Sequence, residues 1–306
     1  MNHALWQDPE WLAGAHAWVE AQLAGLGLTR SGDIEQPHVY PWSTVLRVPT
    51  DAGTVWFKAN TDQLRHEAAL VDVIARRRPD AVPPMLAFDP ATGWMLMADA
   101  GEQLRSVVPR EQSLARWLDV LGLYAGIQLA LADDVDALLE LGVPDMRLAT
   151  LPEKYDLLMD EIDAEPRFRE ASSRVRALAD ELAAYDLPEL LQHDDLHDGQ
   201  VFVREGRHLV MDWGDACISH PFFTLSVTLE GVLAWGLDDV EDSEDTRPYR
   251  DAYLKPFAER YDGDLVAAAT LATRLGWACR AVNGHVPGEN KQTVTRLRMF
   301  LDGRPD

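Results

Sequence analysis

The sequence predicts an α+β fold, in which a small N-terminal lobe with an antiparallel sheet precedes a larger, mostly helical C-terminal lobe. Two observations support this prediction. Strand-prone runs interrupted by turn residues occupy residues 39–60 and 85–97, with one helical segment between them. Beyond residue 101 helical periodicity dominates, apart from one stretch at 191–213. We therefore expect two lobes, residues 1–98 and 99–306, and 306 residues suffice for both.

The N-terminal lobe is expected to open with a helix and continue with strands. Trp11, Ala15, Val19 and Leu23 recur at near-helical spacing after the helix-starting pair Asp8-Pro9. The turn residues 49–53 then separate two strand-prone runs, which predicts a hairpin. The rest of the lobe is predicted as a helix over 63–78 and a strand pair, 85–87 and 94–97, joined by the turn 89–93.

The C-terminal lobe is expected to be helical except for one hairpin. Apolar residues at helical spacing begin at Leu114 and predict further helices over 152–162, 167–185, 222–235, 250–261, 265–282 and 291–301. The exception is a pair of short strand-prone runs, 201–203 and 208–211, on either side of the turn Glu205-Gly206-Arg207.

Composition narrows the range of partners. The chain carries 28 basic and 51 acidic residues, a formal charge of -23, which repels nucleic acid and anionic membrane surfaces. Either a well-solvated surface or attraction of a cationic substrate explains this acidity. No secretory signal or membrane-spanning stretch is evident. Cys217 and Cys279 lie far apart without paired Cys or His at ligand spacing, which indicates neither a disulfide nor a zinc site and favours the cytoplasm.

The segment most informative about function is His193-Asp194-Asp195-Leu196-His197-Asp198-Gly199-Gln200. It is followed, after the hairpin, by Met211-Asp212-Trp213-Gly214-Asp215. An isolated D-x-x-x-x-Q is typical of an exposed polar turn. The loop, hairpin and D-W-G together resemble the catalytic loop and metal-binding segment of the aminoglycoside phosphotransferase family, relatives of the protein kinases. The resemblance implies a two-lobed, protein kinase-like fold and a small-molecule kinase.

The resemblance also implies roles for individual residues. Asp195 matches the catalytic base that orients the substrate hydroxyl and accepts its proton, and Gln200 and Asp212 match the ligands of Mg²⁺. Gln200 stands where the family commonly has Asn, and its amide oxygen can still bind a hard cation. Asp194 stands where the family often has Gly. His193 matches a structural histidine, and His197 either packs or faces the substrate; a metal site at these two histidines is the alternative.

The N-terminal lobe offers residues for the nucleotide. Lys58 ends an apolar strand, like the lysine that contacts the α- and β-phosphates in kinase-like enzymes, and Glu67 on the following helix is its candidate ion-pair partner. Taken alone, such a pair is an ordinary surface contact. The turn 41–44 contains no glycine, so Ser43 and Thr44 are expected to bind phosphates through hydroxyl and backbone donors, the alternative being a structural turn.

The strand that leads into the second lobe resembles the family's hinge. Backbone groups from Met97 to Asp99 are expected to meet the adenine edge, although a plain core strand would carry the same residues.

These assignments predict transfer of the γ-phosphate of ATP or GTP to a hydroxyl of an aminoglycoside-like compound, an amino sugar or another small alcohol. The acidic run 238–245 and Glu230 would suit a cationic acceptor. A catalytically silent nucleotide-binding regulatory protein is the alternative, motivated by Gln200 and the glycine-free turn. A protein kinase is disfavoured because no A-P-E element follows Asp212. The sequence does not indicate an oligomeric state.

Overall fold

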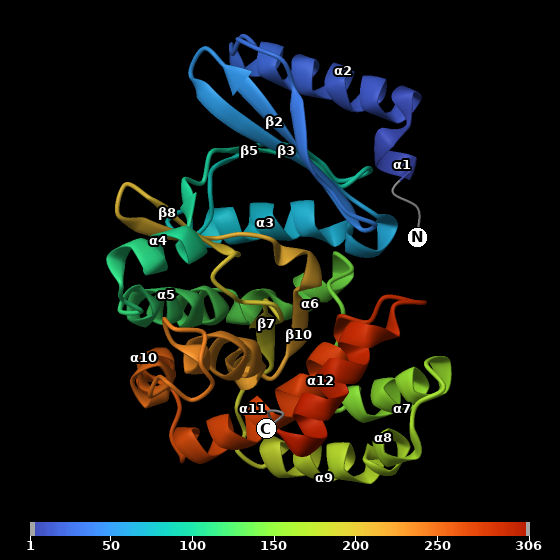
Figure 1. Cartoon of the computed structure of the whole chain (residues 1–306), viewed down its shortest axis with the longest axis vertical. Coiled ribbons are helices and arrows are strands. Elements are labelled where there is room, and N and C mark those ends of the chain that lie inside the picture. The colour runs from blue at the N-terminus through green and yellow to red at the C-terminus, as the bar shows by residue number, and fades with distance from the viewer. Residues whose placement is uncertain (1–3, 304–306) are drawn as a thin grey trace. The chain divides into compact units, whose positions relative to one another are not determined.

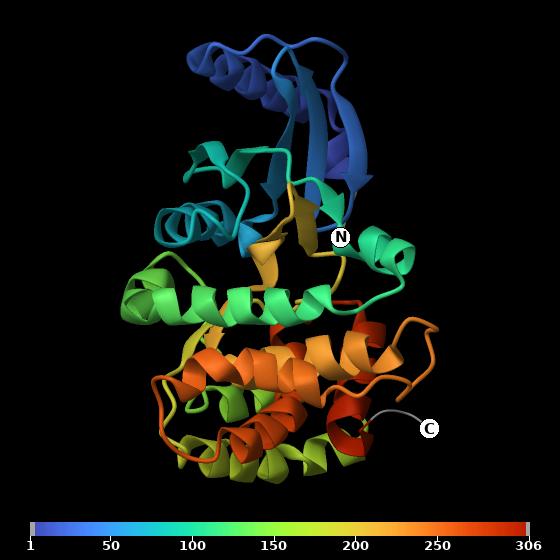
Figure 2. The ribbon, with the colours of Figure 1, turned by 90° about the vertical axis from the view of Figure 1, so that its left-hand side faces the viewer.

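A computed structural model describes residues 4–303 (Figures 1 and 2). The chain forms two compact units. The first comprises the chain up to Gly101 together with Arg204–Gly214, and the second comprises Glu102–Val203 and the chain from Asp215 onward. The assignment of nucleotide binding to residues 1–98 and of catalysis to residues 99–306 stays a prediction.

The first unit contains the predicted antiparallel sheet. Five strands pair in the order β1-β2-β3-β5-β4, and every pairing in this sheet is antiparallel. The elements of this unit are α1 (Ala4–Gln7), α2 (Pro9–Leu26), β1 (Glu35–Val39), β2 (Ser43–Thr50), β3 (Gly53–Asn60), α3 (His66–Arg77), β4 (Met85–Asp89), β5 (Trp94–Ala98) and β9 (Arg207–Val210).

The opening helix α2 begins where the sequence predicts. The Asp8 carboxylate accepts hydrogen bonds from the backbone N–H groups of Glu10 and Trp11, both at 2.9 Å, and caps the helix. Its buried residues are Ala15, Val19 and Leu23, and they belong to the same hydrophobic core as residues of the sheet. Helix α2 lies beside this sheet (Figure 1).

The side chains of strand β3 alternate between the two faces of the sheet, and one of these faces carries a functional candidate. Phe57 is buried in the core shared with α2. The next residue, Lys58, therefore points to the opposite face, where it meets Glu67 of α3. The alternation places a lysine on the α3 side of the sheet.

The second unit is mostly helical, as predicted. Helices α5 and α10 lie side by side in it (Figure 2). Its elements are β6 (Glu102–Gln103), α4 (Leu104–Glu111), α5 (Arg116–Ala130), α6 (Val135–Glu140), α7 (Leu151–Glu161), α8 (Pro166–Glu170), α9 (Ser172–Ala183), β7 (Leu190–Gln192), β8 (Val201–Arg204), β10 (Cys217–Ser219), α10 (Arg247–Ala258), α11 (Leu265–Asn283) and α12 (Asn290–Asp302).

One segment differs from its predicted structure, and another matches it. The helix expected over 222–235 is instead a short 3₁₀ turn, a π-helical segment Ser226–Val232 and another 3₁₀ turn. π-Helical segments are rare and are frequently found at functional sites. Strands β8 and β9 match the expected hairpin runs, and their connection has positive φ at both Glu205 and Gly206, the requirement of a type I′ turn.

Among residues 4–303, no helix combines the length and apolar character needed to cross a membrane.

Candidate active site

Lys58 lies at the centre of a buried polar cluster in the first unit. Its ammonium group donates to Glu67 Oε1 at 2.8 Å and to Asp212 Oδ1 at 2.5 Å. Burial alone would lower the pKa of Lys58, but the Asp212 and Glu67 carboxylates outweigh burial and raise it. The lysine therefore stays charged, as a phosphate-binding lysine must.

Glu67 connects three parts of this unit. Besides Lys58, its carboxylate accepts hydrogen bonds from the Asn60 side-chain amide at 2.5 Å and from the Trp213 backbone N–H at 2.9 Å. It is almost fully buried, with 1% of the residue exposed. The predicted pair is thus part of a buried network that fixes the turn at residue 212, which an ordinary surface pair would not do.

Asp212 combines exposure with backbone strain. Its side chain is 49% exposed, and its φ is 62°. Residues other than Gly adopt this left-handed conformation at a cost, and such residues gather at active sites. The structure therefore presents the predicted metal ligand in an unusual, locally held conformation.

The glycine-free turn is closed by backbone contacts. The Tyr40 N–H donates to the Ser43 carbonyl at 2.9 Å, which leaves a two-residue loop of Pro41 and Trp42. The Thr44 hydroxyl donates to the His38 carbonyl at 2.8 Å and is buried. Phosphate binding by Ser43 and Thr44 stays a prediction.

The predicted hinge is held by side chains of the same unit. The Asp99 carboxylate accepts from the Trp56 indole N–H at 2.8 Å, and the Asp99 carbonyl accepts from the Arg204 guanidinium. Met97 is buried in β5, opposite Trp56. Adenine binding here also stays a prediction.

In the second unit, the loop after β7 is anchored on both sides. The Tyr124 hydroxyl accepts from the His193 backbone N–H at 2.8 Å, and the Thr228 hydroxyl donates to the Leu196 carbonyl at 2.8 Å. The His193 ring is fully buried, and its Nδ1 accepts from the Asp195 N–H at 3.3 Å. His193 therefore braces the backbone of the candidate base.

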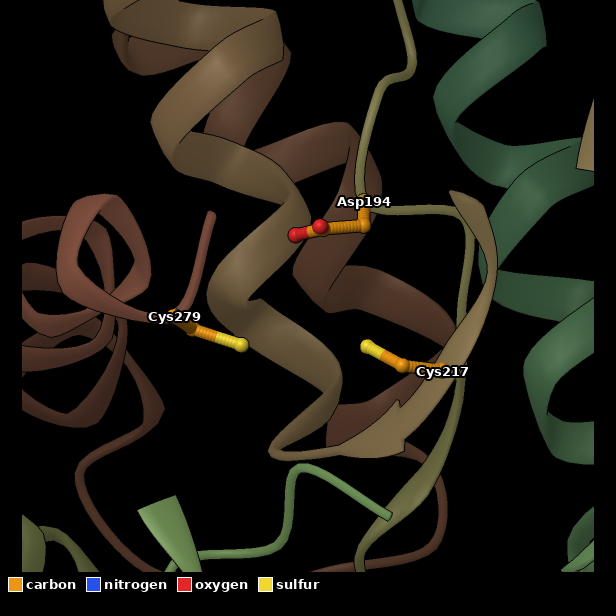
Figure 3. Close-up of side chains that lie close together, drawn as sticks. All are labelled: Asp194, Cys217 and Cys279. Carbon is orange, nitrogen blue, oxygen red and sulfur yellow. The ribbon is translucent and has the colours of Figure 1, made fainter. Parts of the chain in front are cut away.

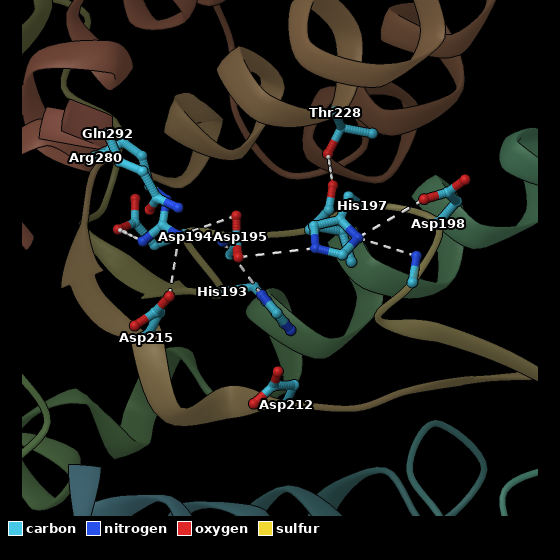
Figure 4. A network of polar contacts seen from close by, with 12 residues as sticks. His193, Asp194, Asp195, His197, Asp198, Asp212, Asp215, Thr228, Arg280 and Gln292 are labelled. Carbon is cyan, nitrogen blue, oxygen red and sulfur yellow. Dashed lines mark hydrogen bonds and ion pairs between the residues drawn. The ribbon is translucent and has the colours of Figure 1, made fainter. Parts of the chain in front are cut away.

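Asp195 lies between a buried arginine and a histidine (Figure 4). Its Oδ1 is 3.0 Å from Arg280 Nη2, and its Oδ2 is 3.8 Å from His197 Nε2. Burial raises the pKa of Asp195, but Arg280, followed by His197, outweighs burial, so the net pKa is below the usual value. The carboxylate is therefore ionised at neutral pH and available to accept a hydrogen bond from a hydroxyl.

The far end of the loop is a tight turn. The Gln200 N–H donates to the His197 carbonyl at 2.9 Å, immediately before β8 begins. His197 Nδ1 accepts from the Gly199 N–H at 3.0 Å and lies 3.1 Å from Arg105 Nη2. His197 packs within the turn and also lines a cavity, and whether it faces the substrate stays a prediction.

That cavity lies wholly within the second unit and has a volume of about 750 Å³, a size suited to a small-molecule ligand. Asp195 lines it together with other residues of the loop after β7 and residues of α4, α5, α11, α12 and the π-helical region. Of the acidic run 238–245, Asp239 reaches this cavity, while Asp245 pairs with Arg247. Glu230 instead accepts a hydrogen bond from Trp277 Nε1 at 2.5 Å.

With this geometry in place, comparison with known proteins identifies the family. The sequence matches the phosphotransferase enzyme family over residues 41–273. The chain belongs to this family. The predicted enzyme class, a phosphotransferase, is thereby confirmed. No curated protein matches the sequence significantly.

Solved structures of similar fold accompany this phosphotransferase family match. Macrolide 2′-phosphotransferase MphH from Brachybacterium faecium is 16% identical, with a TM-score of 0.58 over 95% of this chain and 99% of that one. A choline/ethanolamine kinase family protein from Mesorhizobium loti is 13% identical, with a TM-score of 0.59 over 94% and 91%. APH(2″)-IIia in complex with GDP and kanamycin is 13% identical, with a TM-score of 0.59 over 94% and 98%. At these identities the likeness shows the fold, and the predicted kinase-like fold is confirmed.

Arg280 is a residue of the candidate site that no sequence pattern indicates. Only 3% of it is exposed, and it pairs with three carboxylates, at 3.3 Å from Asp194, 3.0 Å from Asp195 and 3.0 Å from Asp215 (Figure 4). A single arginine within the apolar run 275–282 is a weak signal of a buried ion pair. Its partners, however, are 65 to 86 residues away in the sequence, which local patterns cannot show.

Asp194 has a backbone reason for occupying a glycine position of the family. Its φ is 65°, a conformation that Gly adopts freely and Asp tolerates better than most residues. Burial raises the pKa of Asp194 to about 6, although Arg280 and the Asn283 amide oppose this effect. Asn283 donates to its carboxylate at 2.8 Å.

We expect Asp194→Asn to change the pH dependence of stability. Because the folded-state pKa exceeds the unfolded value, ionisation of Asp194 lowers the free energy of unfolding as pH rises from about 4 to about 6. Asn also tolerates φ near 65° but cannot ionise. Relative to wild type, the variant should therefore gain on the order of 2 kcal/mol between pH 4 and pH 7, measured by urea unfolding. The exposed Asp180→Asn serves as control, and parallel curves for Asp194→Asn and wild type would contradict this expectation.

The two cysteines, distant in the sequence, meet next to Asp194 (Figure 3). Their sulfur atoms and an Asp194 oxygen lie within 4.8 Å of one another, and all three residues are buried. The hydrogen bond with Cys217 and burial raise the pKa of Cys279, and burial raises that of Cys217. Both side chains are thus held as neutral thiols, which favours packing over metal binding, because metals bind the thiolate.

Proposed function

We propose that this phosphotransferase transfers the γ-phosphate of ATP or GTP to a hydroxyl of a small molecule, with Asp195 as the catalytic base. The observation that carries the proposal is the position of Asp195: an ionised carboxylate that lines a cavity of about 750 Å³ within the second unit. A base must reach the proton that it accepts, and a bound hydroxyl in this cavity would be within its reach. Arg280 and His193 hold the carboxylate and its backbone in place.

The donor side of the proposal rests on the first unit. Lys58 would bind the α- and β-phosphates, with Glu67 holding its ammonium group. Ser43 and Thr44 would add donors to the phosphates, and the backbone from Met97 to Asp99 would bind the adenine edge. Loss of any of these residues is expected to weaken nucleotide binding.

Asp212 and Gln200 would hold Mg²⁺. A half-exposed carboxylate and an amide oxygen are hard oxygen donors of the kind that Mg²⁺ prefers, so the residues fit the ion. When bound, Mg²⁺ neutralises charge on the phosphates of the donor. Two buried, neutral thiols also fit a reducing cytoplasm, where we place the enzyme.

The experiment is a screen of nucleotide consumption with ATP or GTP and Mg²⁺ over four acceptor classes: amino sugars and aminoglycosides, macrolides, choline-like amino alcohols, and neutral or acidic alcohols. We expect turnover with one class, and mass spectrometry should show the acceptor gaining one phosphate. Peptide substrates should give none.

Two outcomes would contradict the proposal. Magnesium-dependent nucleotide binding without turnover of any acceptor would favour the silent regulatory protein, for which Gln200 and the glycine-free turn are the motivating observations. Absence of nucleotide binding would contradict both functions.

A further inference from the structure

Most of the charged side chains that line the cavity already have an ion-pair partner within the protein. Arg105 pairs with Asp198 at 2.9 Å, and Arg280 pairs with Asp195. Arg296 of α12 also lines the cavity, but no carboxylate of residues 4–303 lies within ion-pair distance of it. Within the described chain, Arg296 is therefore the cavity's arginine without a direct counter-ion.

Neutral acceptors hold the Arg296 guanidinium in place. Nη1 donates to the Gly284 carbonyl at 2.7 Å and, at 3.5 Å, to that of Arg280, while Nη2 lies 3.4 Å from Gln292 Oε1. These contacts orient the group and leave part of its five-donor fork unused. Burial and the neighbouring Arg280 lower the pKa of Arg296 to about 10, although the Asp195, Asp194 and Asp215 carboxylates oppose this effect, so Arg296 is still charged at neutral pH. A partly buried, oriented arginine with no carboxylate of residues 4–303 in direct contact favours an anionic ligand.

Aromatic and aliphatic side chains form much of the cavity wall. Trp117 and Trp277 are largely buried, and Trp235 is partly buried beside Val227 of the π-helical segment. The hydrogen bond from Trp277 to Glu230 fixes one of these rings. Such walls suit a ligand with an apolar body, because its burial releases water from both surfaces.

A polycationic ligand would need several unpaired carboxylates. Asp195 and Asp198 already have arginine partners, and Asp239, which has no ion pair among residues 4–303, is exposed to solvent. An exposed carboxylate contributes little to binding because water screens it. The charge of the cavity therefore fits an amino sugar poorly.

We infer that the acceptor, given the phosphoryl transfer proposed above, is an apolar hydroxy acid: its carboxylate binds Arg296, its body packs on the tryptophans and its hydroxyl reaches Asp195. The planar guanidinium fork matches a carboxylate geometrically. The overall charge of -23 does not prevent this binding, because salt screens distant charges beyond about 8 Å.

The test compares three ligands with one body: hydroxymethyl-naphthoate, its carboxamide and its aminomethyl counterpart. Calorimetry in the presence of Mg²⁺ and a non-hydrolysable ATP analogue measures binding, and product mass measures transfer in a separate assay with ATP. We expect the wild-type protein to bind the acid at least about tenfold more tightly than the amine. Arg296→Met should remove this preference, and Arg296→Lys should retain part of it.

A control variant distinguishes the effect of the Arg296 charge in the cavity from the effect of the protein's net charge. Arg298→Met removes an arginine from the same helix, two residues away, that pairs with Glu165 and does not line the cavity. We expect it to leave the preference within about twofold of wild type. Circular dichroism and retained binding of Mg²⁺ and nucleotide show that each variant is folded.

The outcomes distinguish this inference from the proposed function. Equal or tighter binding of the amine, no binding of the acid, or an acid preference that survives Arg296→Met would overturn the inference, whether or not another acceptor is phosphorylated. Tight binding of the acid, dependent on Arg296 but without transfer to any acceptor, would instead support the anion site and contradict the catalytic role of the loop.

Discussion

Asp195→Ala should lower kcat by roughly 10²- to 10⁴-fold while leaving nucleotide affinity within about twofold of wild type. The carboxylate is the candidate base, and the residues proposed to bind the nucleotide phosphates, Lys58 among them, belong to the other unit. Arg280 keeps Asp194 and Asp215 as partners in the variant, so the loop should not lose its fold. Steady-state kinetics with an acceptor found by the screen, combined with calorimetry of nucleotide binding, check both parts.

Asp215→Asn is the matched control for this prediction. It also removes a carboxylate from Arg280, but not the carboxylate assigned as the base. We expect its kcat to stay within about tenfold of wild type. Similar and mild effects of Asp195→Ala and Asp215→Asn would show that the cluster is structural, and Asp195 would lose its assignment as the base.

Features fixed by nearby residues are those that the sequence predicts well. The cap at Asp8, the strand that carries Lys58, and the positive-φ turn at Glu205 and Gly206 each depend on chemistry within a few residues. The order of strand-rich and helix-rich segments follows from the same local signals. The fold class could therefore be predicted from one chain without relatives.

Two of the helical differences show where local signals stop. Residues 222–235 have helical periodicity, yet the structure has a π-helical segment there. Close packing offers a physical reason: a Cβ on Gly276 of α11 would lie 2.9 Å from the Phe223 carbonyl, and Ser226 donates to the Thr273 carbonyl. Helix α4, Leu104–Glu111, carries an internal proline at Pro109 and was not predicted.

Some residues of the candidate site can be predicted from the sequence, and others cannot. The sequence predicts Asp195, Gln200 and Asp212 because they belong to one contiguous pattern. Arg280 and Arg296 come from helices near the end of the chain. The cysteine pair beside Asp194 is hidden for the same reason, since its members are brought together by packing of β10 and α11. Tertiary packing sets these contacts, and no spacing rule encodes them.

Asp212→Asn should abolish most of the magnesium dependence of nucleotide binding. In wild type, we expect Mg²⁺ to raise ATP affinity at least about tenfold, and EDTA to reverse the effect. The variant keeps the size of the side chain and tolerates φ of 62°, but it replaces an anionic oxygen donor with a neutral one. Calorimetry of ATP binding with Mg²⁺ and with EDTA measures both affinities.

The loss of a magnesium ligand can be distinguished from a change in the position or charge of Lys58. In Asp212→Asn, Lys58 keeps Glu67 as its counter-ion at 2.7 Å, so the lysine remains charged and placed for phosphate. ATP affinity measured in EDTA should then equal or exceed that of wild type, because Lys58 is no longer shared with Asp212. Asp62→Asn, an exposed change in the same unit, should leave the magnesium effect intact. If Asp212→Asn weakened binding equally with and without Mg²⁺, the residue would act through Lys58 alone and would not be a metal ligand.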